Sequence, residues 1–380
     1  MKKNQLVTLG KHIDILSGCA FPSSGFNRNN GVPLIRIRDI LSGKTETYYE
    51  GSYDLKYLIK KGDLLVGMDG DFNREYWKGT DALLNQRVCK ITPNPETLDK
   101  NFLYHFLQKE LDKIHATTDV VTVKHLSVKK IQDIKIRLPS LKEQKRIAAI
   151  LDKADAIRQK REQAIKLADD FLRAKFLEMF GTPANNIHRF PKGTIRDLVD
   201  SVNYGTSAKA SIDSGEYPIL RMGNITYQGR WDFTDLKYLD LSVKEKDKYL
   251  VKEGDLLFNR TNSKELVGKT AVYEEDRPMA FAGYLIRVRP NSIGNNYYIS
   301  GYLNSIHGKI TLMNMCKSIV GMANINAQEL QNIEILIPPK HLQDEYEIIY
   351  KKIKKGLSIY DKSAMQLQLL ASNLSNKYFM

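Results

Sequence analysis

Three carboxylates stand close together in the stretch GMDGDFNREYW, and they are the residues best spaced for catalysis. Asp69, Asp71 and Glu75 form a tight acidic group in a setting typical of a loop. A nuclease needs clustered carboxylates to hold a divalent metal ion. Here, however, a glycine falls between the aspartates, and Arg74 occupies a place where a further acidic ligand would be needed. A metal-dependent nuclease using Asp69 and Asp71 is therefore the alternative hypothesis, and carboxylates that face solvent or DNA are the preferred one.

The other common catalytic patterns do not occur. The triplets Gly43–Thr45 and Gly268–Thr270 lack the earlier glycine that a phosphate-binding P-loop requires. The tetrapeptide IPPK lacks the polar and aromatic residues of an amino-methyltransferase motif, and the histidines lack metal-binding spacing. Three cysteines, far apart and without CxxC spacing, suit a reducing cytoplasm and no zinc site. The sequence thus predicts a chain that is not an enzyme and uses no cofactor or metal.

Polar residues beside the expected strands are suited to reading DNA bases. Arginine pairs with guanine, asparagine and glutamine pair with adenine, and lysine, serine and threonine hold phosphates. The candidate DNA-binding residues are Arg36, Arg38, Asp69, Asp71, Asn73, Arg74, Gln86, Arg87 and Lys124, then Arg221, Asn224, Asn259, Arg260, Thr261, Asn262 and Ser263. For any single one of them, a solvated charge or a turn cap is an equally good interpretation. The hypothesis rests on the group, above all on the uninterrupted polar run after the apolar LLF.

The charge balance supports a polyanionic partner. The 380 residues include 58 Lys and Arg against 44 Asp and Glu, a net charge of +14. Such a surplus, present in both halves, favours nucleic acid or an anionic membrane surface, although charge for solubility alone is the other interpretation. Neither a secretion signal nor an apolar run long enough to cross a membrane is present. We therefore expect a cytoplasmic protein that does not span a membrane and that binds a polyanion such as nucleic acid.

The elements that would position these residues occur twice along the chain. VPLIRIRDI (Val32–Ile40) returns as YPILRMGNI (Tyr217–Ile225), and both alternate as a strand does. KKGDLL returns as KEGDLL, and HLSVKKIQDIKIRLPSLKEQ (His125–Gln144) aligns without a gap to NINAQELQNIEILIPPKHLQ (Asn324–Gln343). The offset grows from block to block, so insertions fall in the segments between. One scaffold used twice with different loops is the expected result.

Each repeat ends in a long helical pattern. The first runs without Gly or Pro to Phe180, where Gly181 and Pro183 give a stop signal, and the second follows Pro339. Apolar residues at spacings of three and four predict a seam on each helix. If the seams meet, chain order makes the pair antiparallel. The alternative is that each helix packs on its own globule.

Taken together, the pattern resembles the specificity subunit of type I restriction-modification systems. The elements that carry the resemblance are PLIRIRDI and PILRMGNI, the GDLL turns, and IRLPSLKEQKRIAAIL before a long helix; they span essentially the whole chain. The second copy, IPPKHLQDEY, departs after its glutamine. The resemblance implies an α+β fold with mixed sheets, two long antiparallel coiled-coil-like helices and internal pseudo-two-fold symmetry. The implied domains are target-recognition domains 1–139 and 181–338 and helical spacers 140–180 and 339–380.

The resemblance also implies a function and partners. A specificity subunit reads a bipartite, asymmetric DNA target and docks two modification (adenine methyltransferase) subunits and the motor-nuclease restriction subunits, which carry the catalysis. A specificity subunit serving a fused restriction-methylation enzyme is the alternative. The partner-binding residues implied are Gln144, Arg146, Ile150, Gln343 and Tyr346. The segments MDGDFNR and NRTNS follow GDLL at matching places, which makes them the first place to look for the difference between the two half-targets.

Overall fold

The computed structural model describes residues 6–118, 124–319 and 322–379. The chain divides into two compact units: unit 1 comprises residues 1–160 and 363–380, and unit 2 comprises residues 161–362. Two long helices, α3 (Leu141–Phe180) and α8 (Lys340–Phe379), each contribute one part to unit 1 and one part to unit 2. Within the described residues, no helix is long and apolar enough to cross a membrane.

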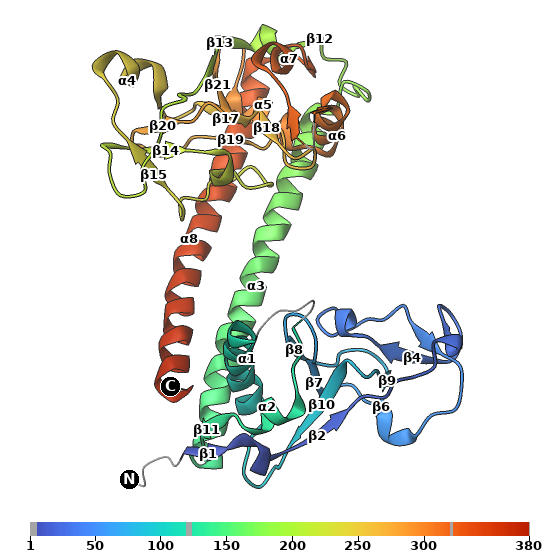
Figure 1. Ribbon diagram of the computed structural model, residues 1–380. Coiled ribbons are helices and arrows are strands. Elements are labelled where there is room, and N and C mark those ends of the chain that lie inside the picture. Colours follow the sequence, from blue (N-terminus) through green and yellow to red (C-terminus); the bar gives the residue numbers. More distant parts are fainter. Residues whose placement is uncertain (1–5, 119–123, 320–321, 380) are drawn as a thin grey trace. The chain divides into compact units, whose positions relative to one another are not determined.

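Unit 1 contains an antiparallel four-stranded sheet, a mixed five-stranded sheet and a short two-stranded ladder (Figure 1). In the five-stranded sheet, β4 and β9 are parallel, whereas the other pairs are antiparallel. In spatial order the sheets are β2 (Ile13–Ser17), β10 (Val88–Pro93), β7 (Leu64–Gly67), β8 (Arg74–Tyr76); β3 (Phe26–Asn27), β5 (Tyr48–Tyr49), β4 (Val32–Ile35), β9 (Ala82–Leu84), β6 (Leu58–Ile59); and β1 (Leu6–Thr8), β11 (Lys135–Arg137). Helices α1 (Lys100–Thr117) and α2 (Val128–Gln132) complete the unit.

Unit 2 repeats this plan. Its sheets are β13 (Val199–Tyr204), β21 (Leu285–Pro290), β17 (Leu256–Asn259), β19 (Thr270–Val272); β15 (Lys237–Leu239), β14 (Tyr217–Leu220), β20 (Met279–Phe281), β16 (Leu250–Val251); and β12 (Lys192–Thr194), β24 (Glu334–Leu336). Again one pair, β14 and β20, is parallel. A further sheet is β18 (Thr261–Asn262), β23 (Met322–Asn324), β22 (Lys317–Ile319), and the helices are α4 (Val243–Tyr249), α5 (Asn296–Asn304), α6 (Ile306–Met315) and α7 (Ala327–Gln331). The predicted repeat, mixed sheets and α+β class are confirmed.

The strand predicted over each PLIRIRDI-like block is shorter than its alternation indicated. Only Val32–Ile35 and Tyr217–Leu220 are extended, and each is followed by a 3-10 turn, Ile37–Asp39 or Met222–Asn224. In each turn a side chain replaces strand pairing: Asp39 accepts a hydrogen bond from the Arg36 amide and Asn224 accepts one from the Arg221 amide. Short polar side chains of this kind compete with the strand ladder by bonding the nearby main chain.

The GDLL blocks form the same turn in both units. Gly62 and Gly254 have φ angles of 90° and 88°, a left-handed conformation that glycine adopts without steric cost. The following aspartate closes the turn, because the Lys60 amide donates to Asp63 Oδ2 and the Lys252 amide donates to Asp255 Oδ2, both at 2.9 Å. The strands that follow, β7 and β17, are buried along their whole length.

The two turn aspartates differ in their surroundings. Asp255 is 4% exposed and accepts two hydrogen bonds from the Arg289 guanidinium, at 2.8 and 3.1 Å. The buried Arg287 guanidinium lies 3.9 Å away, and burial lowers its pKa. In unit 1 the matching Asp63 is about one quarter exposed and pairs with Lys90 at 3.3 Å. In unit 2 a buried aspartate therefore lies between a buried and a partly exposed arginine, whereas unit 1 has one half-buried pair.

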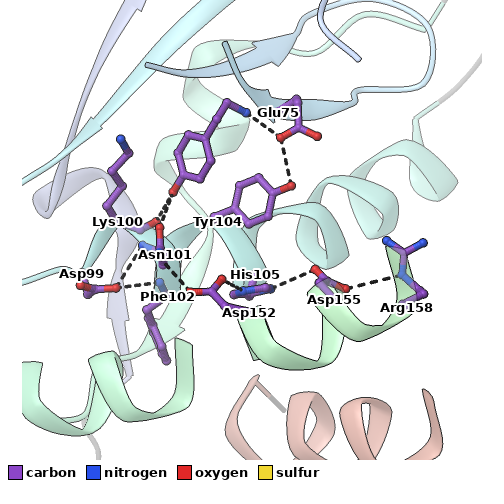
Figure 2. Close-up of polar contacts among 11 residues, drawn as sticks. Glu75, Asp99, Lys100, Asn101, Phe102, Tyr104, His105, Asp152, Asp155 and Arg158 are labelled. Atoms are coloured by element: carbon purple, nitrogen blue, oxygen red, sulfur yellow. Dashed lines mark hydrogen bonds and ion pairs between the residues drawn. The ribbon is translucent and has the colours of Figure 1, made fainter. Parts of the chain in front are cut away.

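Helix α1 is fastened to α3 through a polar contact that Figure 2 shows. The Asp99 carboxylate caps the first turn of α1 by accepting hydrogen bonds from the Asn101 and Phe102 amides. One turn on, His105 is buried between two carboxylates of α3: its Nε2 lies 2.7 Å from Asp152 Oδ1 and its Nδ1 lies 3.9 Å from Asp155 Oδ2. This contact fixes one face of α1 while its apolar face packs into the core of unit 1.

The ends of the long helices pack into the cores of the units. At the start of α3, Ile147 and Leu151 join the core of unit 1, and at its end Phe176 and Phe180 join the core of unit 2. The C-terminal Phe379 of α8 packs against Phe102 and Phe106 in unit 1. Each end therefore joins the core of the unit that contains it, and neither helix packs solely on the globule that precedes it in the chain.

Candidate nucleic-acid interface

After the buried GDLL strand of each unit, one residue is hydrogen-bonded through its main chain to two other segments. In unit 1, the Met68 amide donates to the Arg87 carbonyl at 2.9 Å, and the Met68 carbonyl accepts from the Leu126 amide at 2.7 Å. In unit 2, the Arg260 amide donates to the Tyr284 carbonyl at 3.0 Å, and its carbonyl accepts from the Ile325 amide at 2.9 Å. We call these two places the strand-end crossings: Met68 with Arg87 and Leu126 in unit 1, and Arg260 with Tyr284 and Ile325 in unit 2. Each joins three segments that are distant in sequence.

In unit 1 the side chains at the crossing are charged. Asp69 Oδ1 lies 2.6 Å from His125 Nδ1, and Asp69 Oδ2 lies 3.3 Å from Arg87 Nε. The side chains of Arg87 and His125 are 64% and 71% exposed, whereas that of Asp69 is 17% exposed. The mostly buried Asp69 carboxylate therefore orients two exposed side chains, the Arg87 guanidinium and the His125 imidazole. Two of the predicted residues, Asp69 and Arg87, are brought together here.

In unit 2 the same place is aromatic and largely uncharged. Thr261 donates its hydroxyl to Asn324 Oδ1 at 2.9 Å, and these two residues occupy the places of Asp69 and His125. The Arg260 guanidinium lies over the Tyr204 ring, 4.8 Å from its centre. Tyr204 and Tyr284 are 42% and 55% exposed. The two crossings therefore share their main-chain anchors and differ in side-chain chemistry.

Not every predicted DNA-binding residue reaches the surface. Asn224 is 3% exposed; besides accepting from Arg221, its amide donates to the Asp232 and Asp235 carbonyls. Asn259 is fully buried, with its amide directed at the Leu266 carbonyl at 3.4 Å. Both belong to the interior of unit 2, and their assignment to a DNA surface is corrected.

Other candidates hold neighbouring elements together. The Arg74 guanidinium stacks 3.4 Å from the centre of the Tyr104 ring, which in turn stacks on Tyr76, so it joins β8 to α1. Arg221 is tied to the Asp235 carboxylate at 2.8 Å. Lys124 donates its ammonium to the His115 carbonyl at 2.6 Å, and Asn73 offers its carbonyl to the Gly67 amide. The remaining predicted residues that are exposed or partly exposed are Arg36, Arg38, Asp71, Gln86, Asn262 and Ser263.

The carboxylates of GMDGDFNREYW do not assemble a metal site. Asp69 is held by His125 and Arg87, and Glu75 accepts a hydrogen bond from the Tyr104 hydroxyl at 3.1 Å (Figure 2). Among the residues that the structure describes, no group of three or more His, Cys, Asp and Glu is placed to hold a metal ion. The neighbours of these carboxylates are donors, which is the arrangement of an ion-pair network.

Three of the five predicted partner-binding residues are structural. Gln144 is 1% exposed; its side chain accepts from the Asp99 amide and donates to the Thr97 and Pro139 carbonyls. Gln343 is fully buried and donates to the Ile293 and Pro338 carbonyls. Tyr346 is 3% exposed and packs against the Phe176 and Phe180 rings. Their burial corrects the assignment to a partner surface, whereas Arg146 is exposed and Ile150 is partly exposed.

We expect the two buried glutamines to be stability determinants. Gln144→Ala should lower the unfolding free energy of unit 1, and Gln343→Ala that of unit 2, by about 1–3 kcal/mol, because each leaves buried main-chain groups unpaired. The two tryptophans report separately, Trp77 on unit 1 and Trp231 on unit 2, in urea-unfolding fluorescence. Lys145→Ala, at an exposed neighbouring position, is the control. Equal midpoints for all three variants would contradict the assignment.

Sequence reasoning missed His125, Tyr204 and Tyr284. One signal was available for the first, because the gapless alignment of the third repeat block pairs His125 with Asn324, and both lie at the crossings. The tyrosines had no such signal. Tyr204 is placed by a hydrogen bond that its hydroxyl accepts from the Ala327 amide, 123 residues away.

Comparisons with known proteins give one consistent result. A family model described as "Type I restriction modification DNA specificity domain" matches residues 1–167 and 190–371. The type I restriction enzyme EcoBI specificity subunit of Escherichia coli is 30% identical over 401 residues, covering 97% of this chain and 82% of the relative. The EcoKI specificity subunit of Escherichia coli strain K12 is 23% identical, covering 92% and 80%. The crystal structure of a type I restriction-modification S subunit from M. genitalium has the same fold, with a TM-score of 0.66, 15% identity, and coverage of 100% and 97%.

Proposed function

This chain belongs to the family of type I restriction-modification DNA specificity proteins, and we propose that its two units each read one half of a bipartite, asymmetric target in double-stranded DNA. The observation that carries the proposal is the pair of strand-end crossings. The main-chain anchors match, but Asp69, Arg87 and His125 stand in one unit where Thr261, Tyr284 and Asn324 stand in the other. One scaffold thus presents two different sets of donors, acceptors and rings.

The exposed residues of each crossing fit base reading. The Arg87 guanidinium can donate two hydrogen bonds to a guanine edge, and the Asp69 pairing holds it in one orientation. In unit 2, Asn262 can pair with adenine, and the exposed tyrosines offer apolar and hydroxyl contacts. The net charge of +14 supplies the sequence-independent attraction to phosphates.

We infer that catalysis lies with partner subunits. In this proposal two adenine-methyltransferase (modification) subunits and the motor-nuclease (restriction) subunits dock on the chain, and the chain itself is not an enzyme. Exposed apolar residues on the long helices, including Leu167 and Phe171 of α3 and Met365 and Leu369 of α8, support protein partners. The ion pairs of Asp69 favour this reading over the metal-dependent nuclease. A fused restriction-methylation enzyme as the partner is the second candidate.

The test is the methylation pattern that the chain directs. We expect coexpression with the modification subunit of the same system to methylate adenines in a split motif, two short defined halves separated by a fixed number of undefined bases. The modification subunit alone serves as the control and should give no such motif. A continuous motif would count against reading by two separate units.

A further inference from the structure

Unit 2 contains a pocket that lies apart from its strand-end crossing. It has a volume of about 290 Å3 and is lined by α3, the segment 227–230, α5, α6 and the first part of α8. Leu172, Ile310, Met313 and Tyr227 give it apolar walls. The segment 227–230 is seated tightly, because Gly229 has a φ of 77° and a Cβ there would meet the Asn304 side chain at 2.5 Å. The wall formed by Tyr227 is thus fixed by a close backbone approach.

The charged groups of the pocket are predominantly cations. Arg173, Arg230, Lys309 and Lys354 line it, against one carboxylate, Asp169. That carboxylate is already paired, because Arg230 lies 2.5 Å from its Oδ1. Arg173 lies 3.9 Å from Asp170 Oδ1, a carboxylate outside the lining, and Lys354 lies over the Tyr350 ring. The charge of the lining itself is net positive.

Lys309 is the least well compensated of these cations. Its ammonium makes one long hydrogen bond, 3.4 Å, to the Gly268 carbonyl, and it lies 5.1 Å from the centre of the Tyr227 ring. Within the described part of the chain it forms no ion pair with a carboxylate. Burial, with Lys269 and Arg173 nearby, lowers the pKa of Lys309 to about 8. Lys309 is partly buried, and a partly buried ammonium with no carboxylate beside it loses solvation that a neighbouring anion would offset.

We propose that this pocket binds a small organic anion in which a phosphate group is carried by a flat ring, that is, a nucleotide. The phosphate lies against Lys309 and Arg173, and the ring lies against Tyr227 and the apolar walls. A phosphate alone would leave the apolar walls unfilled, and an uncharged ring would leave Lys309 uncompensated. Two sources can supply this nucleotide: a free mononucleotide, or one nucleotide of a single-stranded nucleic acid. Both present a phosphate group together with a flat ring.

Titration calorimetry on the full-length chain tests the proposal with three probes: adenosine monophosphate, adenosine and inorganic phosphate. We expect saturable binding of adenosine monophosphate, and binding at least about 10-fold weaker for each of the other two, because charge-assisted bonds and ring contacts each contribute measurably. Lys309→Met should weaken adenosine monophosphate binding by at least about 10-fold. The control, Lys244→Met, removes an exposed lysine on α4 and should leave binding unchanged.

The pH dependence gives a second readout. Binding to the wild-type chain should weaken between pH 7 and 9, because Lys309 loses its proton as pH rises through its pKa of about 8. Lys309→Arg keeps its charge in this range and should remove the pH dependence. The other charged or titratable groups that line the pocket or lie beside this lysine are Asp169, Arg173, Tyr227, Arg230, Lys269, Tyr346, Tyr350 and Lys354.

Each outcome of the calorimetry either supports the nucleotide site or overturns it. Failure of all three probes to bind, or equal affinity in the wild type and Lys309→Met, would overturn the proposal. If Lys309→Met does not fold, Arg173→Met takes its place, with the same expectation. Competition by a single-stranded oligonucleotide would identify nucleic acid as the source of the phosphate, and its absence would identify a free nucleotide.

Discussion

Asp255→Ala should lower the unfolding free energy of unit 2 by about 3–5 kcal/mol, because it leaves a buried cation without its partner. Asp255 holds the Arg289 guanidinium through two hydrogen bonds and lies beside the buried Arg287. It also closes the turn before β17 by accepting from the Lys252 amide. Urea unfolding followed by Trp231 fluorescence in the wild type and the variant measures the loss.

The repeat supplies a matched control for this change. Asp63→Ala removes the equivalent aspartate of unit 1, where the partner is Lys90 at 3.3 Å and both side chains are about one quarter exposed. A single, partly exposed pair of this kind contributes about 1 kcal/mol or less, so the loss of unfolding free energy reported by Trp77 should come mainly from the broken turn hydrogen bond. Equal losses in the two units would show that burial of the ion network is not the deciding factor.

Arg87→Ala should relax recognition at one position in one half of the DNA target and leave the other half unchanged. A bidentate arginine-guanine contact contributes about 1–3 kcal/mol of discrimination, which corresponds to roughly 5- to 150-fold in affinity. Methylation-motif sequencing should then show one degenerate position. Arg260→Ala should act on the other half, because it occupies the crossing of unit 2.

Two results would contradict this assignment of Arg87. If it holds a phosphate instead, binding should weaken about equally for all sequences, and the slope of affinity against salt should fall by about 1. Degeneracy in both halves would contradict separate reading by the two units. Arg28→Ala, which removes an exposed arginine outside the predicted set, controls for the loss of one positive charge.

The architecture was predictable because it is encoded locally. The GDLL turns need only glycine at a positive φ and an aspartate that accepts from the amide three residues earlier. The long helices follow from apolar spacing and from terminal Gly and Pro. Because these signals occur twice in the same order, the repeat could be recognised before any contact was known.

The site was less predictable because exposure depends on distant residues. Asn224 and Asn262 are chemically the same side chain beside a strand, but Asn224 is enclosed by Asp232 and Asp235 and Asn262 is partly exposed. Gln144 is buried by Thr97 and Asp99, more than 40 residues earlier. Nothing in the short motif around either residue indicates which of its neighbours will cover it.

The strand-end crossings have a consequence for how such proteins diversify. Their anchors are main-chain amides and carbonyls, which nearly every amino acid supplies, so Met68 in one unit and Arg260 in the other satisfy the same bonds. Substitutions at the crossing therefore change what the surface presents while the anchoring bonds remain. Under the proposed reading of DNA by the crossings, a point mutation here would change the DNA preference while keeping the bonds that anchor the fold.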